Sequence, residues 1–165
     1  MAQEKTSQQI ILPSTVAGRA DLGRIINELS GLDNFFYQTK LRSPGSNVAA
    51  PKLSQSLNVV AETNKISLLD GKQRKNLLET LRSIKEHAPS IHISFAVEAP
   101  VPFDQKIVLW IRQNIHPQAL VEIGLQPNIS IGCILRTTNK IFDMSLKNRF
   151  AASKKKLFED IRGNG

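Results

Sequence analysis

One stretch decides the fold of this chain: Pro127-Asn-Ile-Ser-Ile-Gly132-Cys-Ile-Leu-Arg-Thr-Thr-Asn-Lys-Ile141-Phe-Asp143-Met-Ser145-Leu146. The apolar run 131–136 predicts a short strand. The polar residues 137–140 predict a tight turn, because Asn tolerates a positive φ, and the two apolar residues that follow predict a returning strand. Asp143 and Ser145 are suited to accept hydrogen bonds from the free N–H groups at a helix start. The stretch therefore predicts strand, turn, short strand and helix.

The predicted final helix is amphipathic. Its apolar stripe recurs at spacings of three and four residues, as Leu146, Phe150, Ser153, Leu157 and Ile161, with Phe158 beside it. The opposite face carries Lys147, Lys154, Lys155 and Lys156.

Working outward, the residues before this stretch alternate between strand and helix patterns. From Ile91 to Val97 apolar residues recur at every second position, which predicts a half-buried strand. A helical pattern over 103–115, with Ile107, Val108, Ile111 and Ile115 inward, and a strand pattern over 119–125 follow. The sequence therefore predicts an α+β fold in which helices pack on a small mixed sheet of about four strands.

The N-terminal part is helical in pattern and forms an extension to this fold. The helix expected over 19–37 has an apolar stripe that begins with Leu22, Ile25, Ile26 and Leu29. Two interpretations are open, because so short a helix is marginal alone: the stripe packs on this chain or on another chain. Residues 52–89 predict two helices, the second of them capped by Asp70 with Gln73 three residues on.

Proline, glycine and serine in residues 42–51 predict a linker. We therefore divide the chain into a helical segment 1–41, a linker 42–51, and a domain 52–165 with leading helices.

Composition narrows the class of protein. The 165 residues are 41% hydrophobic, which can support a core, and contain a single cysteine, Cys133, which fits a reducing compartment. There is no run of eighteen apolar residues, so we expect no membrane span. The formal net charge of +8 favours an anionic partner, although Lys154 to Lys156 are the only tight cluster of positive residues.

Motifs for catalysis are missing. The sequence has neither a glycine-rich phosphate loop nor a dinucleotide fingerprint. The three histidines, His87, His92 and His116, lack partners at helical spacing that could share a metal. Cys133 lies in an apolar run, where cysteine acts as a small hydrophobe. Capping explains Asp143 and Ser145 better than acid–base chemistry does, so we expect no enzyme activity, metal or cofactor.

The stretch quoted first resembles the C-terminal domain of the delta subunit of F-type ATP synthase, the oligomycin-sensitivity-conferring protein family. The resemblance covers about residues 90–160 and includes a glycine in the first strand and an Asp-x-Ser cap before the last helix. Cys133 and Met144 depart from it, since both replace residues that are usually glycine. The matching residues are Pro127, Ile129, Ile131, Gly132, Asn139, Lys140, Ile141, Asp143, Ser145, Leu146, Arg149 and Phe150.

The resemblance implies a non-catalytic subunit of the peripheral stalk, a stator that connects the catalytic head to the proton-conducting membrane sector during ATP synthesis and proton transport. Its implied partners are the head subunits and the b-type stalk subunits, at the cytoplasmic face of the plasma membrane. The residues before the matching strand are too few for the six-helix bundle of that family, so we expect residues 19–40 to act as a short tether. The expected contact residues are Leu146, Phe150, Leu157 and Phe158 toward the stalk, and Leu22, Ile25, Ile26 and Leu29 as a second surface.

A different class is also open, a small basic nucleic-acid-binding protein. The net charge and a sheet with helices permit it. The predicted strands, however, carry no aromatic pair suited to base stacking, so we expect no nucleic-acid partner.

Overall fold

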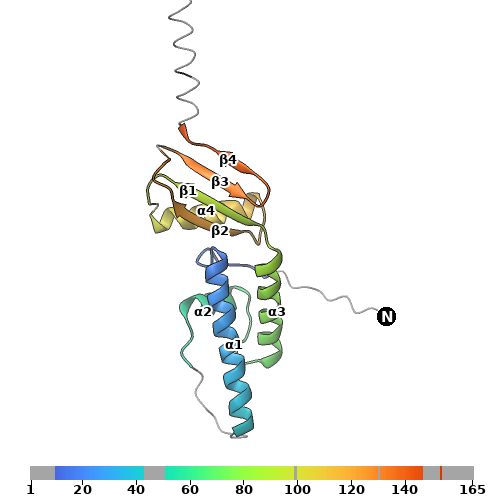
Figure 1. Ribbon diagram of the computed structural model, residues 1–165. Helices are drawn as coiled ribbons and strands as arrows, with labels where there is room; N and C mark the ends of the chain where they lie inside the picture. Colours follow the sequence, from blue (N-terminus) through green and yellow to red (C-terminus); the bar gives the residue numbers. More distant parts are fainter. Residues whose placement is uncertain (1–9, 43–50, 99, 130, 147–152, 154–165) are drawn as a thin grey trace, which may run out of the picture.

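The computed structural model describes residues 10–42, 51–98, 100–129, 131–146 and 153 (Figure 1). Within them the chain is α+β, with helices and a mixed four-stranded sheet, as predicted. The elements in order are α1 (Arg19–Arg42), α2 (Gln55–Thr63), α3 (Gly71–His87), β1 (Ser90–Phe95), α4 (Val101–Asn114), β2 (Leu120–Leu125), β3 (Cys133–Thr137) and β4 (Ile141–Asp143).

Local signals set the ends of the helices. Ser54 caps α2 by accepting a hydrogen bond from the Leu57 N–H, and Asp70 caps α3 by accepting one from the Lys72 N–H. The predicted cap at Asp70 is therefore confirmed. Gln73, however, accepts from the N–H of Ser67 and so ties down the preceding loop instead of completing a capping box with Asp70.

The first three helices and residues 10–17 form what we call the helical unit. Its core is made by α1, α2 and α3 together with the leading segment, in which Ile10, Leu12 and Val16 are buried. The two helices on either side of the predicted linker thus share one core, and α1 lies along α3 (Figure 1). Within the predicted linker, Arg42 is the last residue of α1, and residues 43–50 lie outside the described residues.

The remaining elements form the sheet unit, with strand order β2-β1-β3-β4. β1 and β2 are parallel because α4 connects them, while β3 is antiparallel to β1 and to β4. Ile91, Ile93 and Val121 are buried against Val108 and Ile111 of α4. Two expectations for this unit are wrong: the strand ends at Phe95, leaving Val97 exposed, and Ile115 lies past the end of α4 with its side chain 53% exposed.

A buried arginine joins the two units. Arg112 of α4 is 8% exposed, and its guanidinium group donates hydrogen bonds to backbone carbonyls both of the sheet unit and of the leading segment. Burial lowers its pKa to about 10, so the group stays charged at neutral pH. The acceptors are the carbonyl oxygens of Ala119 at 3.2 Å, Leu12 and Pro13 at 2.9 Å each, Val16 at 2.6 Å and Ala17 at 3.4 Å.

Two further contacts cross between the units. The N–H of Val121 in β2 donates to the carbonyl of Ala17, so the leading segment also satisfies a backbone group of the outer edge of the sheet. Leu120 of β2 is fully buried in the core of the helical unit. Hydrogen bonds and apolar packing therefore both cross the boundary between the two units.

The first prediction concerns Arg112. An Arg112→Met variant keeps the apolar stem but removes every donor, which leaves buried carbonyls unpaired, so we expect it to lose about 3 kcal/mol of unfolding free energy. Urea denaturation followed by circular dichroism measures the loss. Arg82→Met is the control: Arg82 is exposed on α3, with one long 3.4 Å contact to Ser30, and the change should stay within about 0.5 kcal/mol. Equal stability of the two variants would contradict the role assigned to Arg112.

Candidate functional site

The stretch that decides the fold ends in a tightly bonded junction, which we define as residues 131–133 with 143–146. The N–H of Met144 donates to the carbonyl of Cys133, and the N–H of Leu146 donates to the carbonyl of Ile131. The side chain of Asp143 accepts a hydrogen bond from the N–H of Ser145 at 2.9 Å. The chain therefore leaves β4 in a direction that is fixed by several backbone bonds.

Gly132 makes the junction possible. Its φ is +105°, a conformation that residues with a Cβ rarely adopt, and a Cβ placed there would lie 2.5 Å from the Met144 carbonyl oxygen. Both the dihedral angle and the close approach of the Met144 carbonyl therefore require glycine at this position. Ser145 is 7% exposed, and Leu146 is half-buried and has a helical backbone.

The junction lies at the end of the sheet unit that is away from the helical unit. Figure 1 shows the helical unit at one end of an elongated molecule and β4 near the other. The predicted contact residues Phe150, Leu157 and Phe158 lie outside the described residues.

The other predicted contact surface needs a correction. Leu22, Ile25, Ile26 and Leu29 are 0%, 2%, 7% and 0% exposed, and they are part of the core of the helical unit. Of the two interpretations left open by the sequence, packing on this chain is the one the structure shows. A partner could not contact these side chains without opening a core in which each buried leucine contributes about 1.5–3 kcal/mol.

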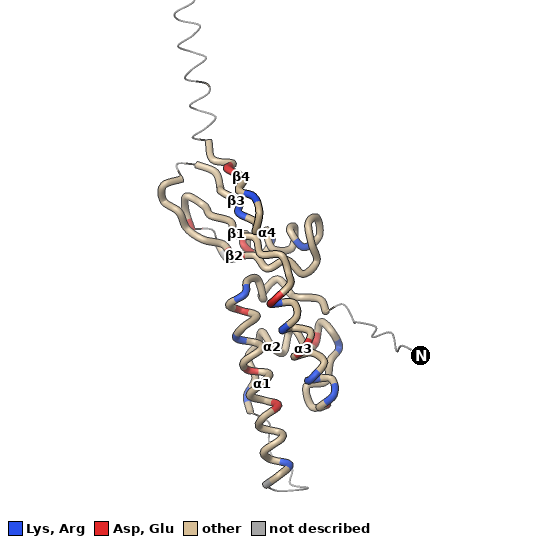
Figure 2. The backbone as a smooth tube through the Cα atoms, turned by 45° about the vertical axis from the view of Figure 1, so that its right-hand side comes forward, with Lys and Arg blue, Asp and Glu red and all other residues tan. Residues whose placement is uncertain are grey.

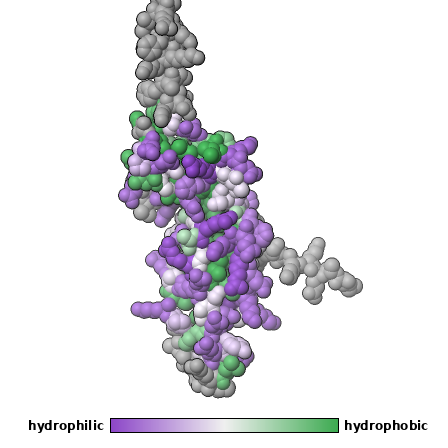
Figure 3. Space-filling model, viewed as in Figure 1, coloured by the Kyte–Doolittle hydropathy of each residue, from purple (hydrophilic) through white to green (hydrophobic). Residues whose placement is uncertain are grey.

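Exposed apolar residues gather instead on the sheet unit. Trp110 and Leu109 project from the outer side of α4, and Ile141 and Phe142 from the edge strand β4. Figure 3 shows hydrophobic residues at the sheet end of the molecule, whereas the side of the helical unit that is turned toward the viewer is mostly hydrophilic. Such apolar surface is typical of a contact site. The full set in the sheet unit and its loops is Val97, Phe103, Leu109, Trp110, Ile115, Leu125, Ile131, Ile141, Phe142 and Met144.

The side chains that could bind a metal ion are dispersed in the described part of the chain. No group of three or more His, Cys, Asp or Glu among them could hold a metal ion. His87 contacts the Ser83 carbonyl, His92 lies 3.7 Å from the Glu122 carboxylate, and His116 accepts from the N–H of Gln118. The three histidines thus have separate local partners.

The helices of the described part of the chain are α1, α2, α3 and α4, together with the helical residues 146 and 153. None of its helices combines the length and the apolar composition that crossing a bilayer requires.

Sequence reasoning missed two buried arginines. Arg112 lies one turn after Val108, on the apolar stripe of α4, and a charge within such a stripe is the signal that could have found it. Arg74 is 5% exposed at the start of α3 and forms a 3.0 Å ion pair with Asp33 of α1. Its neighbours in sequence are polar, so no pattern marks it as buried.

The chain was also compared with known proteins. No family model matches it, and no curated protein matches it.

The second prediction concerns Gly132. Replacement by alanine forces a Cβ against the Met144 carbonyl in a left-handed conformation, so Gly132→Ala should lower the unfolding free energy by about 1–3 kcal/mol. Gly31→Ala is the control, because Gly31 lies in α1 with no atom within 4 Å of its added Cβ. That change should raise stability by about 0.5–1 kcal/mol. Thermal unfolding of both variants tests the prediction, and a neutral Gly132→Ala would refute it.

Proposed function

We propose that this chain is a delta-type subunit of the peripheral stalk of a proton-transporting F-type ATP synthase. In this role it transforms no substrate and belongs to the stator, which holds the catalytic head while the rotor turns. The observation that carries the proposal is the junction of Gly132, Asp143 and Ser145, because the resemblance to that family depends on these residues and each has a defined role in the turn toward the C-terminal segment.

The elongated shape supports a bracing role. A stator has to transmit force between two partners, so its contact surfaces should lie at separate ends of a stiff body. The helical unit and the junction lie at opposite ends (Figure 1), and the hydrogen bonds of Arg112 join the parts between them. Burial of α1 against α3 gives the helical end its own core.

The proposed partners come from the family resemblance. The head subunits and the b-type stalk subunits are the partners that the family would supply, at the cytoplasmic face of the plasma membrane. The exposed apolar residues of the sheet unit, with Trp110 59% exposed, offer the kind of surface on which a partner helix docks. The predicted stripe that includes Phe150, Leu157 and Phe158 supplies further apolar residues after this unit in the sequence.

Charge distribution bears on the alternative of nucleic-acid binding. Lysine and arginine are scattered along both units of the described chain and interspersed with acidic residues (Figure 2). A nucleic-acid-binding domain usually gathers its basic residues on one face. The stalk proposal is therefore preferred.

The third prediction tests the stalk proposal by affinity purification. The full chain, tagged and expressed in cells that carry its gene, should recover both head and b-type subunits. A Leu157→Ser/Phe158→Ser variant should lose the b-type subunits, because it removes two apolar contacts from the predicted stripe. Lys155→Ser/Lys156→Ser, on the opposite face of that predicted helix, is the control and should keep them.

Truncating the chain before Leu53 would be a poor test of the stalk proposal, because the truncation uncovers the buried face of α3 at Leu77, Leu81 and Ile84. Recovery of nucleic acid in place of synthase subunits, lost steeply as salt is added, would contradict the stalk proposal and support the alternative. Recovery of neither class of partner would also contradict it.

A further inference from the structure

A groove opens between the second half of α1 and the start of α3. It has a volume of about 850 Å³. Its lining on α1 recurs at Asp33, Phe36, Tyr37 and Lys40, a spacing that puts these residues on one face of the helix. The other wall is formed by Leu69 and the first turns of α3. We call it the lysine groove.

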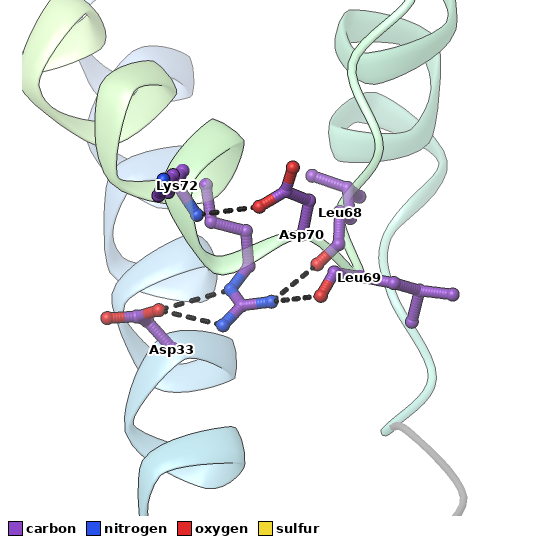
Figure 4. Close-up of polar contacts among 6 residues, drawn as sticks. Asp33, Leu68, Leu69, Asp70 and Lys72 are labelled. Atoms are coloured by element: carbon purple, nitrogen blue, oxygen red, sulfur yellow. Dashed lines mark hydrogen bonds and ion pairs between the residues drawn. The ribbon is translucent and has the colours of Figure 1, made fainter.

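The floor of the groove is rigid. The Arg74 guanidinium donates to the carbonyl oxygens of Leu68 and Leu69, at 2.9 and 3.0 Å, and to the Asp33 carboxylate (Figure 4). It also lies 4.5 Å from the centroid of the Phe36 ring. One buried side chain therefore holds the loop before α3 against α1. A site whose walls are fixed in advance loses less entropy when it binds a partner.

The charges that remain at the rim are positive. The carboxylate of Asp33 is paired with Arg74, and that of Asp70 caps α3. Lys40, Lys72 and Lys75 are exposed, and no hydrogen bond or ion pair of their side chains is found within the described part of the chain. The groove thus has three cations available to a partner and no uncommitted anion in its lining.

Apolar surface accompanies these cations. Tyr37 is 67% exposed and Leu69 is 74% exposed, both in the lining, and Leu41 beside Lys40 is 65% exposed. Among the described residues of the helical unit, Ile11 is the other large apolar side chain exposed to this degree. Exposed apolar residues of this unit are therefore concentrated at the lysine groove.

We propose that the lysine groove binds an acidic amphipathic segment of a partner protein. Its apolar side chains cover Tyr37 and Leu69, and its carboxylates pair with Lys40, Lys72 and Lys75. A rim of like charge around an apolar centre favours this partner over a neutral helix, because complementary charge steers association and fixes the register. A free anion is a poorer occupant, since the Asp70 carboxylate already occupies the α3 N-terminus. The inference does not depend on the stalk proposal.

The fourth prediction uses a synthetic probe and the full chain. The probe is a fluorescent amphipathic helix with leucine on one face and glutamate on the other, and its binding is measured by anisotropy at physiological salt. Lys40→Glu/Lys72→Glu/Lys75→Glu should weaken binding by at least about tenfold. Lys52→Glu/Lys106→Glu/Lys140→Glu makes the same change in net charge at exposed positions elsewhere, and should weaken it by less than about threefold.

The apolar part of the site has its own pair of variants. Tyr37→Ser/Leu69→Ser should weaken probe binding by about tenfold, while Ile11→Ser, at an exposed position outside the groove and outside the sheet unit, should not. Amide NMR shifts of the unmodified chain give a measurement independent of any variant, and the shifts should centre on residues 33–40 and 69–75. Equal losses in the two lysine variants, shifts centred on α4, or an RNA oligonucleotide that displaces the probe and needs the lysines but not Tyr37 would each overturn the proposal.

Discussion

The hydrogen bonds from Arg112 to the leading segment are the interaction on which the rest of the architecture depends. A guanidinium group is costly to bury, and it is tolerated here because its N–H groups meet backbone carbonyls. Those carbonyls belong to residues 12, 13, 16, 17 and 119, which lie in two units of the fold. The segment that precedes α1 is thereby fastened to the end of α4, and the helical core is built on a fixed base.

From that base the molecule extends in two directions. α1 and α3 run away from the sheet on one side, and β4 with the junction at Gly132 lies on the other (Figure 1). Large apolar side chains remain exposed at both ends, around Leu69 and around Trp110.

The sequence predicted the elements that depend on local chemistry. Gly132 before β3 and Asp143 at the end of β4 are residues whose preferences act within a few positions, so the exit of the hairpin could be read directly. The turn at Asn139 was also predicted, but it forms without the positive φ on which that prediction was based. The α+β class also followed, because the periods of two and of three to four residues are properties of single segments.

Long-range pairing could not be read in the same way. The stripe of Leu22, Ile25 and Leu29 indicates burial but does not say against what, and its partner helix α3 lies beyond the predicted linker. Arg112 donates hydrogen bonds to carbonyls 95–100 residues away in sequence. Because every residue has a backbone carbonyl, residue types do not show which carbonyls will be the acceptors. The same reason explains why the position of β3 between β1 and β4 had to come from the structure.

The most direct measurement is ATP-driven proton pumping in inverted membrane vesicles from cells depleted of this chain. A missing stator should uncouple the head from the membrane sector, so pumping is lost while ATP hydrolysis by the head continues, and purified chain added back restores pumping. Vesicles that pump protons normally without the chain would contradict the account.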